Sequence, residues 1–203
     1  LGKFNVAYYS FRCLPFFGVY GHEQCMPMDQ LLHLTRDSSE VKVVVLAASW
    51  PSKIRRESGL YLDSAPESTH LNLFSEGLDT TLKELVGAGK KVMVIGDSPS
   101  FPFNPIECIM PRPFSVDKIP RCKIDLKRYL KEHQQSWSVI ERVITKHKHT
   151  AFFNPESLFC NGVECSMRRN DKLLFRDNDH LSIDGSVFVG HSIGSKILDL
   201  EWL

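Results

Sequence analysis

An aspartate and a histidine three residues apart form the most chemically suggestive pair in this chain. Asp177 and His180 stand in the polar stretch Asp177-Asn178-Asp179-His180, between an apolar run and the start of a predicted helix. A carboxylate at this spacing can fold back onto the imidazole, fix its tautomer and stabilise its protonated form during acyl transfer. The pair therefore predicts a general base that activates a hydroxyl group. A surface residue or a helix-capping element is the alternative interpretation of the motif.

A serine that could be the nucleophile follows a predicted strand, in Gly96-Asp97-Ser98. A nucleophilic serine gains from a helix that begins behind it, because the free N–H groups there stabilise the oxyanion. Pro99, Pro102 and Pro105 follow Ser98 and prevent a regular helix. The sequence therefore argues against Ser98 as the nucleophile and favours a polar turn at the end of a strand.

Other candidate sites in the sequence are weaker. The stretch Gly87-Ala88-Gly89-Lys90 precedes a strand and lacks the spacing of a phosphate-binding loop. His147 and His149 alternate with lysines at the basic end of a predicted helix, which is typical of partners of the helix dipole. The sequence therefore predicts no metal site and no cofactor bound by this domain.

The cysteines form three couples that are local in sequence: Cys13 with Cys25, Cys108 with Cys122, and Cys160 with Cys165. Six cysteines allow 15 pairings, so the sequence does not fix their connectivity. Local pairing is favoured because each couple flanks loop-type sequence rich in Pro, Gly or Asn. Free thiols and a zinc site are the alternatives, although the chain has no Cys-x-x-Cys. Disulfides would place the chain in an oxidising compartment.

Length and composition indicate one globular domain without a nucleic-acid partner. The chain has 203 residues, of which 42% are hydrophobic, enough for one well-buried core. Its 25 basic and 24 acidic residues nearly cancel, and no basic block stands out. The longest apolar runs, such as 43–48, are far shorter than the roughly 18 residues of a membrane helix.

Hydrophobic periodicity predicts strands that alternate with helices. The predicted strands are 4–10, 41–49, 91–95 and 150–153, and the second of these is expected to be buried on both faces. The predicted helices are 27–36, a helix from residue 69 that Gly87 and Gly89 end, 126–144 and 187–198. Residues 99–113 contain five prolines and predict an ordered loop. This alternation predicts a three-layer α/β/α sandwich with a parallel sheet.

In such folds, functional groups gather where the parallel strands end. This rule predicts one rim that holds Ser10 to Cys13, Ser49-Trp50, Asp97-Ser98 and the loop with Asp177 and His180. The charged, Ser-rich segment 51–68 is expected to be a surface excursion, which either shapes a substrate groove or is an ordinary solvated loop.

Three blocks of the sequence together resemble a known family. They are residues 43–50 ending in Ala-Ser-Trp, residues 92–96 followed by a Pro-rich loop with Cys108, and residues 174–182 followed by Gly185. This pattern is similar to the SGNH (GDSL-like) domain fused to bacterial membrane acyltransferases that O-acetylate surface polysaccharides. The resemblance covers essentially the whole chain and implies an SGNH-hydrolase-like, flavodoxin-like fold that lacks its first strand.

The resemblance also implies where the nucleophile lies. Family members carry it in a Gly-Asp-Ser block on the first strand, whereas Gly96-Asp97-Ser98 follows two strands that are already present. The catalytic serine is therefore expected upstream of Leu1, or absent. The chain begins almost inside a strand pattern without an initiator Met. Residues 1–203 are thus expected to be one SGNH-type acyltransferase domain, N-terminally incomplete.

By the same resemblance, His180 is the general base and Asp177 its orienting carboxylate. Simpler SGNH hydrolases form the oxyanion hole with a Gly and an Asn, where this chain has Ser10-Phe11-Arg12 and Ser49-Trp50. Ser49 and Trp50 are candidates for substrate binding. Trp50 either forms a wall against a sugar ring or packs in the core.

The resemblance implies an extracytoplasmic O-acyltransferase domain that transfers acetyl to a hydroxyl of a cell-surface polysaccharide, lipopolysaccharide among them, through a serine ester. The acetyl group would derive from acetyl-CoA through an N-terminal integral-membrane acyltransferase domain. The expected location is the periplasm or the extracytoplasmic face of the bacterial inner membrane. The alternatives are a carbohydrate esterase of the same fold and a catalytically silent carbohydrate-binding or scaffold domain.

Overall fold

A parallel three-stranded sheet lies at the centre of the computed structural model, which describes residues 13–17, 26–54, 67–109 and 122–203. The strands β1 (Val43–Ala47), β2 (Lys91–Ile95) and β4 (Thr150–Phe153) lie in the order β1-β2-β4. In register, Val44 pairs with Val92 and Val94 with Phe152. Parallel neighbours need crossover connections, and long helices supply them here. The predicted α/β fold with a parallel sheet is confirmed.

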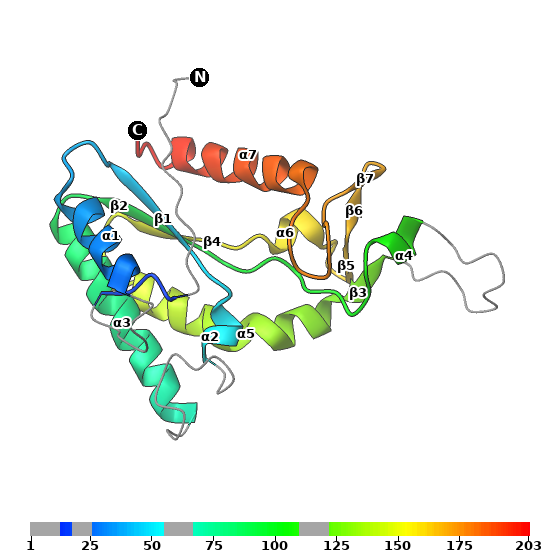
Figure 1. Ribbon diagram of the computed structural model, residues 1–203, viewed down its shortest axis with the longest axis horizontal. Coiled ribbons are helices and arrows are strands. Elements are labelled where there is room, and N and C mark those ends of the chain that lie inside the picture. The colour runs from blue at the N-terminus through cyan, green and yellow to red at the C-terminus, as the bar shows by residue number, and fades with distance from the viewer. Residues whose placement is uncertain (1–12, 18–25, 55–66, 110–121) are drawn as a thin grey trace.

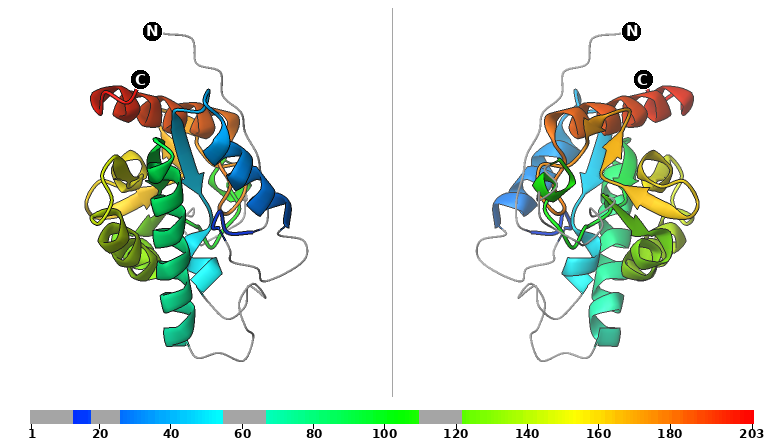
Figure 2. Two further views of the ribbon diagram at one scale, coloured as in Figure 1. Left: turned by 90° about the vertical axis from the view of Figure 1, so that its left-hand side faces the viewer. Right: turned by 90° about the vertical axis from the view of Figure 1, so that its right-hand side faces the viewer.

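Helices lie on both sides of this sheet. The helices α3 (Glu67–Gly87) and α5 (Leu126–Ile144) cover one side, and α7 (Ile183–Asp199) lies across the other (Figures 1 and 2). The remaining helices are α1 (Met26–Asp37), α2 (Trp50–Ile54), α4 (Ile106–Ile109) and α6 (Glu156–Phe159). None of the described helices is long and apolar enough to cross a membrane.

The two covering helices form because their apolar residues recur on one face. In α3, Phe74, Leu78, Leu82 and Leu85 follow one another at intervals of three or four residues, and all are 0% exposed. In α5, the Asp125 side chain accepts a hydrogen bond from the backbone N–H of Lys127 and caps the first turn. The predicted helices and the strands β2 and β4 are confirmed, and in α3 and α5 the predicted apolar faces are buried.

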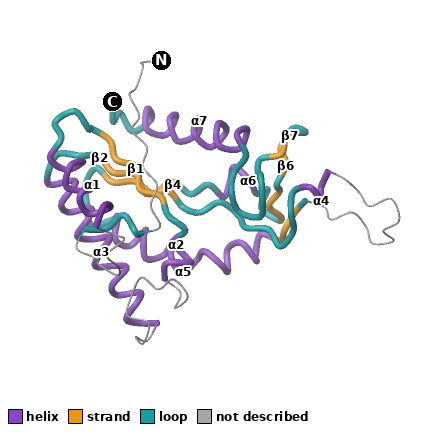
Figure 3. Tube along the Cα trace, in the orientation of Figure 1, coloured by secondary structure: helices purple, strands orange, loops and turns teal. Residues whose placement is uncertain are grey.

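Other predicted elements differ from the structure. The strand β1 is not buried on both faces, since Val45 is 42% exposed and β1 is at one end of the strand order in the described sheet. The Pro-rich loop contains α4, and the predicted surface excursion begins with α2. Two small antiparallel pairs were not predicted: β3 (Lys123–Asp125) with β5 (Glu164–Ser166), and β6 (Arg168–Arg169) with β7 (Lys172–Leu173). Figure 3 shows both pairs away from the central sheet. The predicted strand 4–10 lies outside the described residues.

Disulfides close two loops beside the sheet. Cys108 is bonded to Cys122, and Cys160 is bonded to Cys165, as the local pairing predicts. The first bond ties α4 to the residue that precedes β3, and the second joins the end of α6 to β5. These four cysteines are therefore not zinc ligands. The third predicted pair, Cys13 with Cys25, cannot be placed because Cys25 lies outside the described residues.

The start of α7 is held against the chain segment before the Asp-x-x-His loop. The backbone N–H of Ser182 donates to the carbonyl of Leu174 at 2.9 Å, and the Ser182 hydroxyl donates to the carbonyl of Leu173 at 2.7 Å. The same hydroxyl caps α7 by accepting from the N–H of Gly185. A Cβ on Gly185 would lie 2.0 Å from the Leu174 oxygen, so only glycine permits this close approach.

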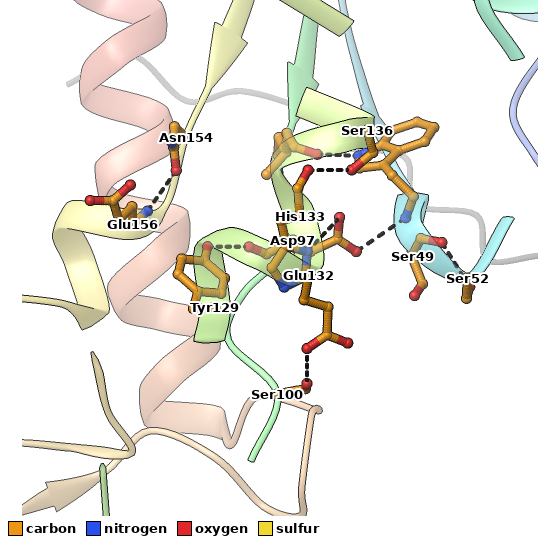
Figure 4. Close-up of polar contacts among 12 residues, drawn as sticks. Ser49, Ser52, Asp97, Ser100, Tyr129, Glu132, His133, Ser136, Asn154 and Glu156 are labelled. Atoms are coloured by element: carbon orange, nitrogen blue, oxygen red, sulfur yellow. Dashed lines mark hydrogen bonds and ion pairs between the residues drawn. The ribbon is translucent and has the colours of Figure 1, made fainter. Parts of the chain in front are cut away.

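A buried carboxyl group, Asp97, joins three elements at the end of β2. Its Oδ1 accepts the backbone N–H of Trp50, the first residue of α2, at 3.1 Å. The Asp97 backbone carbonyl accepts the hydroxyl of Tyr129 on α5 at 2.6 Å (Figure 4). The Asp97 Oδ2 lies 3.8 Å from Nδ1 of His133, also on α5. Burial in this apolar setting raises the pKa of Asp97 to about 8.

Replacing Gly185 by alanine is expected to destabilise the domain, because the added methyl group meets a backbone carbonyl that cannot move freely. We expect the free energy of unfolding to fall by about 1–3 kcal/mol in a denaturant titration. The control is Gly190→Ala on the same helix, where an added Cβ meets nothing within 4 Å. This control should be neutral or more stable by up to about 1 kcal/mol. Equal stability of the two variants would contradict the tight contact.

The raised pKa of Asp97 predicts a pH-dependent stability. Because the folded-state pKa of about 8 lies above the ordinary 3.8, the unfolded chain gives up this proton first as the pH rises. The free energy of unfolding should therefore fall between about pH 4 and pH 8. Asp97→Asn removes this contribution. The difference in free energy of unfolding between wild type and variant should therefore change between about pH 4 and pH 8. For Asp171→Asn, at a fully exposed position, the free energy of unfolding plotted against pH should run parallel to that of wild type. If the difference between wild type and Asp97→Asn were constant over this pH range, the raised pKa of Asp97 would be contradicted.

Candidate functional site

The Asp-x-x-His sequence forms the turn of a short hairpin. Phe175 and Leu181 form an antiparallel bridge, and the backbone N–H of Arg176 donates to the carbonyl of His180 at 3.0 Å. Phe175 is 0% exposed and packs its ring against Phe101 and Phe159. The hairpin is thus anchored in the core at its base, while residues 178–180 of its turn are exposed.

Asp177 fixes both the backbone of this turn and the imidazole ring. Its Oδ1 accepts the backbone N–H of His180 at 2.8 Å and that of Asp179 at 3.2 Å. The His180 Nδ1 lies 2.9 Å from Oδ1 and 3.0 Å from Oδ2 of the same carboxylate. The spacing of three residues therefore produces the carboxylate–imidazole pair that the sequence predicts.

The electrostatics of the turn favour an ionised Asp177. The N–H of His180 lowers the pKa of Asp177 below its usual range, and the N–H of Asp179 and the His180 ring add to this effect. The ionised carboxylate accepts the Nδ1–H, which leaves Nε2 as the unprotonated nitrogen. The His180 side chain is 62% exposed, and in the described part of the chain Nε2 makes no hydrogen bond. This nitrogen is therefore free to accept a proton from an incoming hydroxyl.

A second carboxylate, which the sequence reasoning missed, lies on the same ring nitrogen. Asp179 Oδ1 is 3.0 Å from His180 Nδ1, and its side chain is 63% exposed. One potential ligand atom each from Asp177, Asp179 and His180 lies within 4.8 Å of the others. The contacts of both carboxylates with the imidazole ring account for the closeness of these three side chains. The expectation that this domain binds no metal stays a prediction.

Ser98 stands at the start of the segment that leads from β2 to this turn. The residue follows β2 and is half-buried, and among the described residues its hydroxyl makes no hydrogen bond. The loop that it opens does reach the turn, because the N–H of Phe101 donates to the carbonyl of Asn178 at 2.8 Å. The structure therefore brings the ends of β2 and of the hairpin together, as the rim rule predicts. The exclusion of Ser98 as nucleophile stays a prediction.

Trp50 packs in the core and offers no face to a sugar. Its side chain is 0% exposed and packs in a cluster with the rings of Phe16 and Phe74. Its indole N–H donates to the carbonyl of Ile95 at 2.6 Å. The suggested sugar-binding role of Trp50 is thus replaced by core packing, the alternative that the sequence left open.

Ser49 is exposed at the end of β1, whereas Ser10-Phe11-Arg12 lie outside the described residues.

The sequence reasoning also missed the contribution of α5 to this rim. Tyr129 and His133 lie one turn apart on the same face of α5, and both are buried next to Asp97. Glu132 accepts the hydroxyl of Ser100 at 3.1 Å. The spacing of four residues between Tyr129 and His133 indicates that both lie on one face of the helix. The sequence reasoning missed it because these residues fall among the apolar residues of the same face.

Comparisons with known proteins agree with this geometry. A family model described as the SGNH domain fused to AT3 domains matches residues 2–194. No curated protein matches the chain. Among solved structures, the periplasmic domain of the lipopolysaccharide acetyltransferase of Salmonella ser. Paratyphi A is similar, with a TM-score of 0.63 and 18% identity. That likeness covers 91% of this chain and 68% of the other, and it shows a shared fold. The chain belongs to the family of SGNH domains that are fused to AT3 domains.

Proposed function

We propose that this domain is an extracytoplasmic SGNH-type O-acyltransferase that places an acetyl group on a hydroxyl of a cell-surface polysaccharide. The observation that carries the proposal is the Asp177–His180 pair, in which the carboxylate contacts Nδ1 of an exposed ring and Nε2 makes no hydrogen bond to the described residues. The membership of the SGNH family and the fold shared with the periplasmic domain of a lipopolysaccharide acetyltransferase support it.

In the proposed reaction, His180 moves one proton in each of two steps. First, a serine hydroxyl bonds to the acetyl carbon and gives its proton to Nε2, while the bond from acetyl to the donor breaks and the leaving group takes that proton. Second, the polysaccharide hydroxyl gives its proton to Nε2 and bonds to the acetyl carbon. The bond to the serine oxygen then breaks, and the serine regains the proton. Asp177 stays ionised and stabilises the imidazolium in both steps.

The remaining parts of the apparatus are also proposals. The nucleophile is a serine of a Gly-Asp-Ser block upstream of Leu1, and acetyl-CoA is the source of the acetyl group. Domains of this family are fused to AT3 domains, so we assign the delivery of acetyl to an N-terminal integral-membrane AT3 domain. The disulfides Cys108–Cys122 and Cys160–Cys165 favour an oxidising, extracytoplasmic compartment such as the periplasm.

Hydrolysis is the second candidate reaction, because the exposure of the His180 ring also admits water. Water would then replace the sugar hydroxyl in the second step, with the same proton transfers. Release of free acetate, compared with acetyl found on polysaccharide, separates the esterase from the transferase.

Replacing His180 by alanine in the complete membrane protein should abolish polysaccharide acetylation. Loss of a general base lowers acyl transfer by about 10²–10⁴-fold, which the acetyl methyl signal in the NMR spectrum of the polysaccharide would reveal. The matched control is His191→Ala, an exposed histidine on α7 that should acetylate at the wild-type level. Retained acetylation in a folded His180→Ala variant would contradict the proposed function.

The two carboxylates at Nδ1 should differ in importance. Asp177→Asn should lower acetyl transfer by about 10²–10⁴-fold, because it disturbs both the tautomer of the ring and the backbone of the turn. Asp179→Asn should lower transfer by less than about tenfold, since Asp177 still orients the ring. The same NMR assay on both variants measures the difference. An equal loss would show that both carboxylates orient His180.

A further inference from the structure

A hollow with a volume of about 660 Å³ lies between α2 and α5, where the sheet carries its polar rim. Its apolar side is formed by Pro51 and Ile54 of α2, and its polar side by Arg128, Lys131, Glu132 and Gln135 of α5. This volume falls in the range of about 300–1,000 Å³ that is typical of small-molecule sites. Nothing in the acyl-transfer step described above uses these residues.

A short chain of contacts connects this hollow to the His180 turn. Glu132, on its wall, accepts the hydroxyl of Ser100, and Figure 4 shows the two side chains facing each other. The next residue, Phe101, donates its N–H to the carbonyl of Asn178 inside the turn. A ligand in the hollow would thus lie next to the loop that borders the proposed general base.

Both walls of the hollow are fixed to the same residue. Asp97 accepts the first N–H of α2 through its side chain and the hydroxyl of Tyr129 on α5 through its carbonyl. A site whose walls are already positioned loses less free energy to ordering when a ligand binds. The hollow is therefore a preformed feature of the fold.

The charges on the polar side favour an anion. Arg128 and Lys131 are exposed and lie three residues apart on α5, so their side chains are neighbours. Neither of them forms an ion pair with an acidic residue in the described ranges, whereas the nearby Glu132 carboxylate is engaged by Ser100. Arginine and lysine together suit a carboxylate or a phosphate, whereas Pro51 and Ile54 on the opposite side of the hollow are buried and uncharged.

We propose that this hollow binds an anionic sugar of the acceptor saccharide, with its carboxylate or phosphate group against Arg128 and Lys131. This inference rests on the proposed function and names the substrate class of the same site. The bound sugar holds its chain beside the His180 turn, so that a neighbouring hydroxyl can reach the acyl group.

Binding of defined saccharides to the 203-residue chain tests the inference, and isothermal titration calorimetry is the measurement. The probes are α1,4-linked trigalacturonate and the neutral galactose trisaccharide of the same linkage. We expect trigalacturonate to bind more tightly, and Arg128→Gln and Lys131→Gln each to weaken it by about tenfold. The matched control is Lys127→Gln, which removes an exposed charge from the same helix outside the hollow and should leave binding unchanged.

Competition of galacturonate and of galactose 6-phosphate with bound trigalacturonate distinguishes a carboxylate from a phosphate as the source of negative charge. If either competitor is the stronger, the result supports the inference and identifies the anionic group that the hollow prefers. Equal binding of the acidic and neutral trisaccharides, no effect of Arg128→Gln and Lys131→Gln, or no binding at all would overturn it. The binding is measured without acyl transfer, so the result is independent of the His180→Ala test of the proposed function.

Discussion

The burial of Asp97 at the end of β2 is the interaction on which the arrangement of the rim depends. One residue accepts hydrogen bonds from the first residue of α2 and from Tyr129 of α5, so two helices that are far apart in sequence meet at one strand end. A buried carboxyl is costly when ionised, and the raised pKa of Asp97 is the physical expression of that cost. A hydrophobic residue could not accept the Trp50 N–H, whereas the bond from Tyr129 goes to the backbone carbonyl and does not depend on the side chain.

The His180 turn depends on a second constraint, the tight start of α7. Ser182 is bonded to the carbonyls of Leu173 and Leu174, and Gly185 allows the helix to approach them. Packing of Phe175 in the core holds the other end of the hairpin. The Asp177–His180 pair thus stands on an exposed turn whose two ends are held in place, which combines access from solvent with fixed geometry.

These two constraints meet where Phe101 bonds to Asn178. The end of β2 therefore carries Asp97, which positions α2 and α5, and leads directly into the segment that touches the His180 turn. The His180 ring and a preformed hollow with basic side chains lie along one edge of the sheet. This arrangement is the structural basis of the proposed transfer of an acyl group to a saccharide.

The sequence by itself determined the long helices, the central parallel strands and the contact between Asp177 and His180, because these depend on local spacing. Helical periodicity in residues 67–87 and 126–144, and the three-residue interval from Asp177 to His180, report contacts between near neighbours. The tertiary structure decided the rest. The burial of Trp50, the exposure of Val45, the role of Asp97 and the hollow beside α5 all depend on which distant segments pack together. Such contacts leave no periodic pattern along the chain, since they join residues whose separation in sequence is arbitrary.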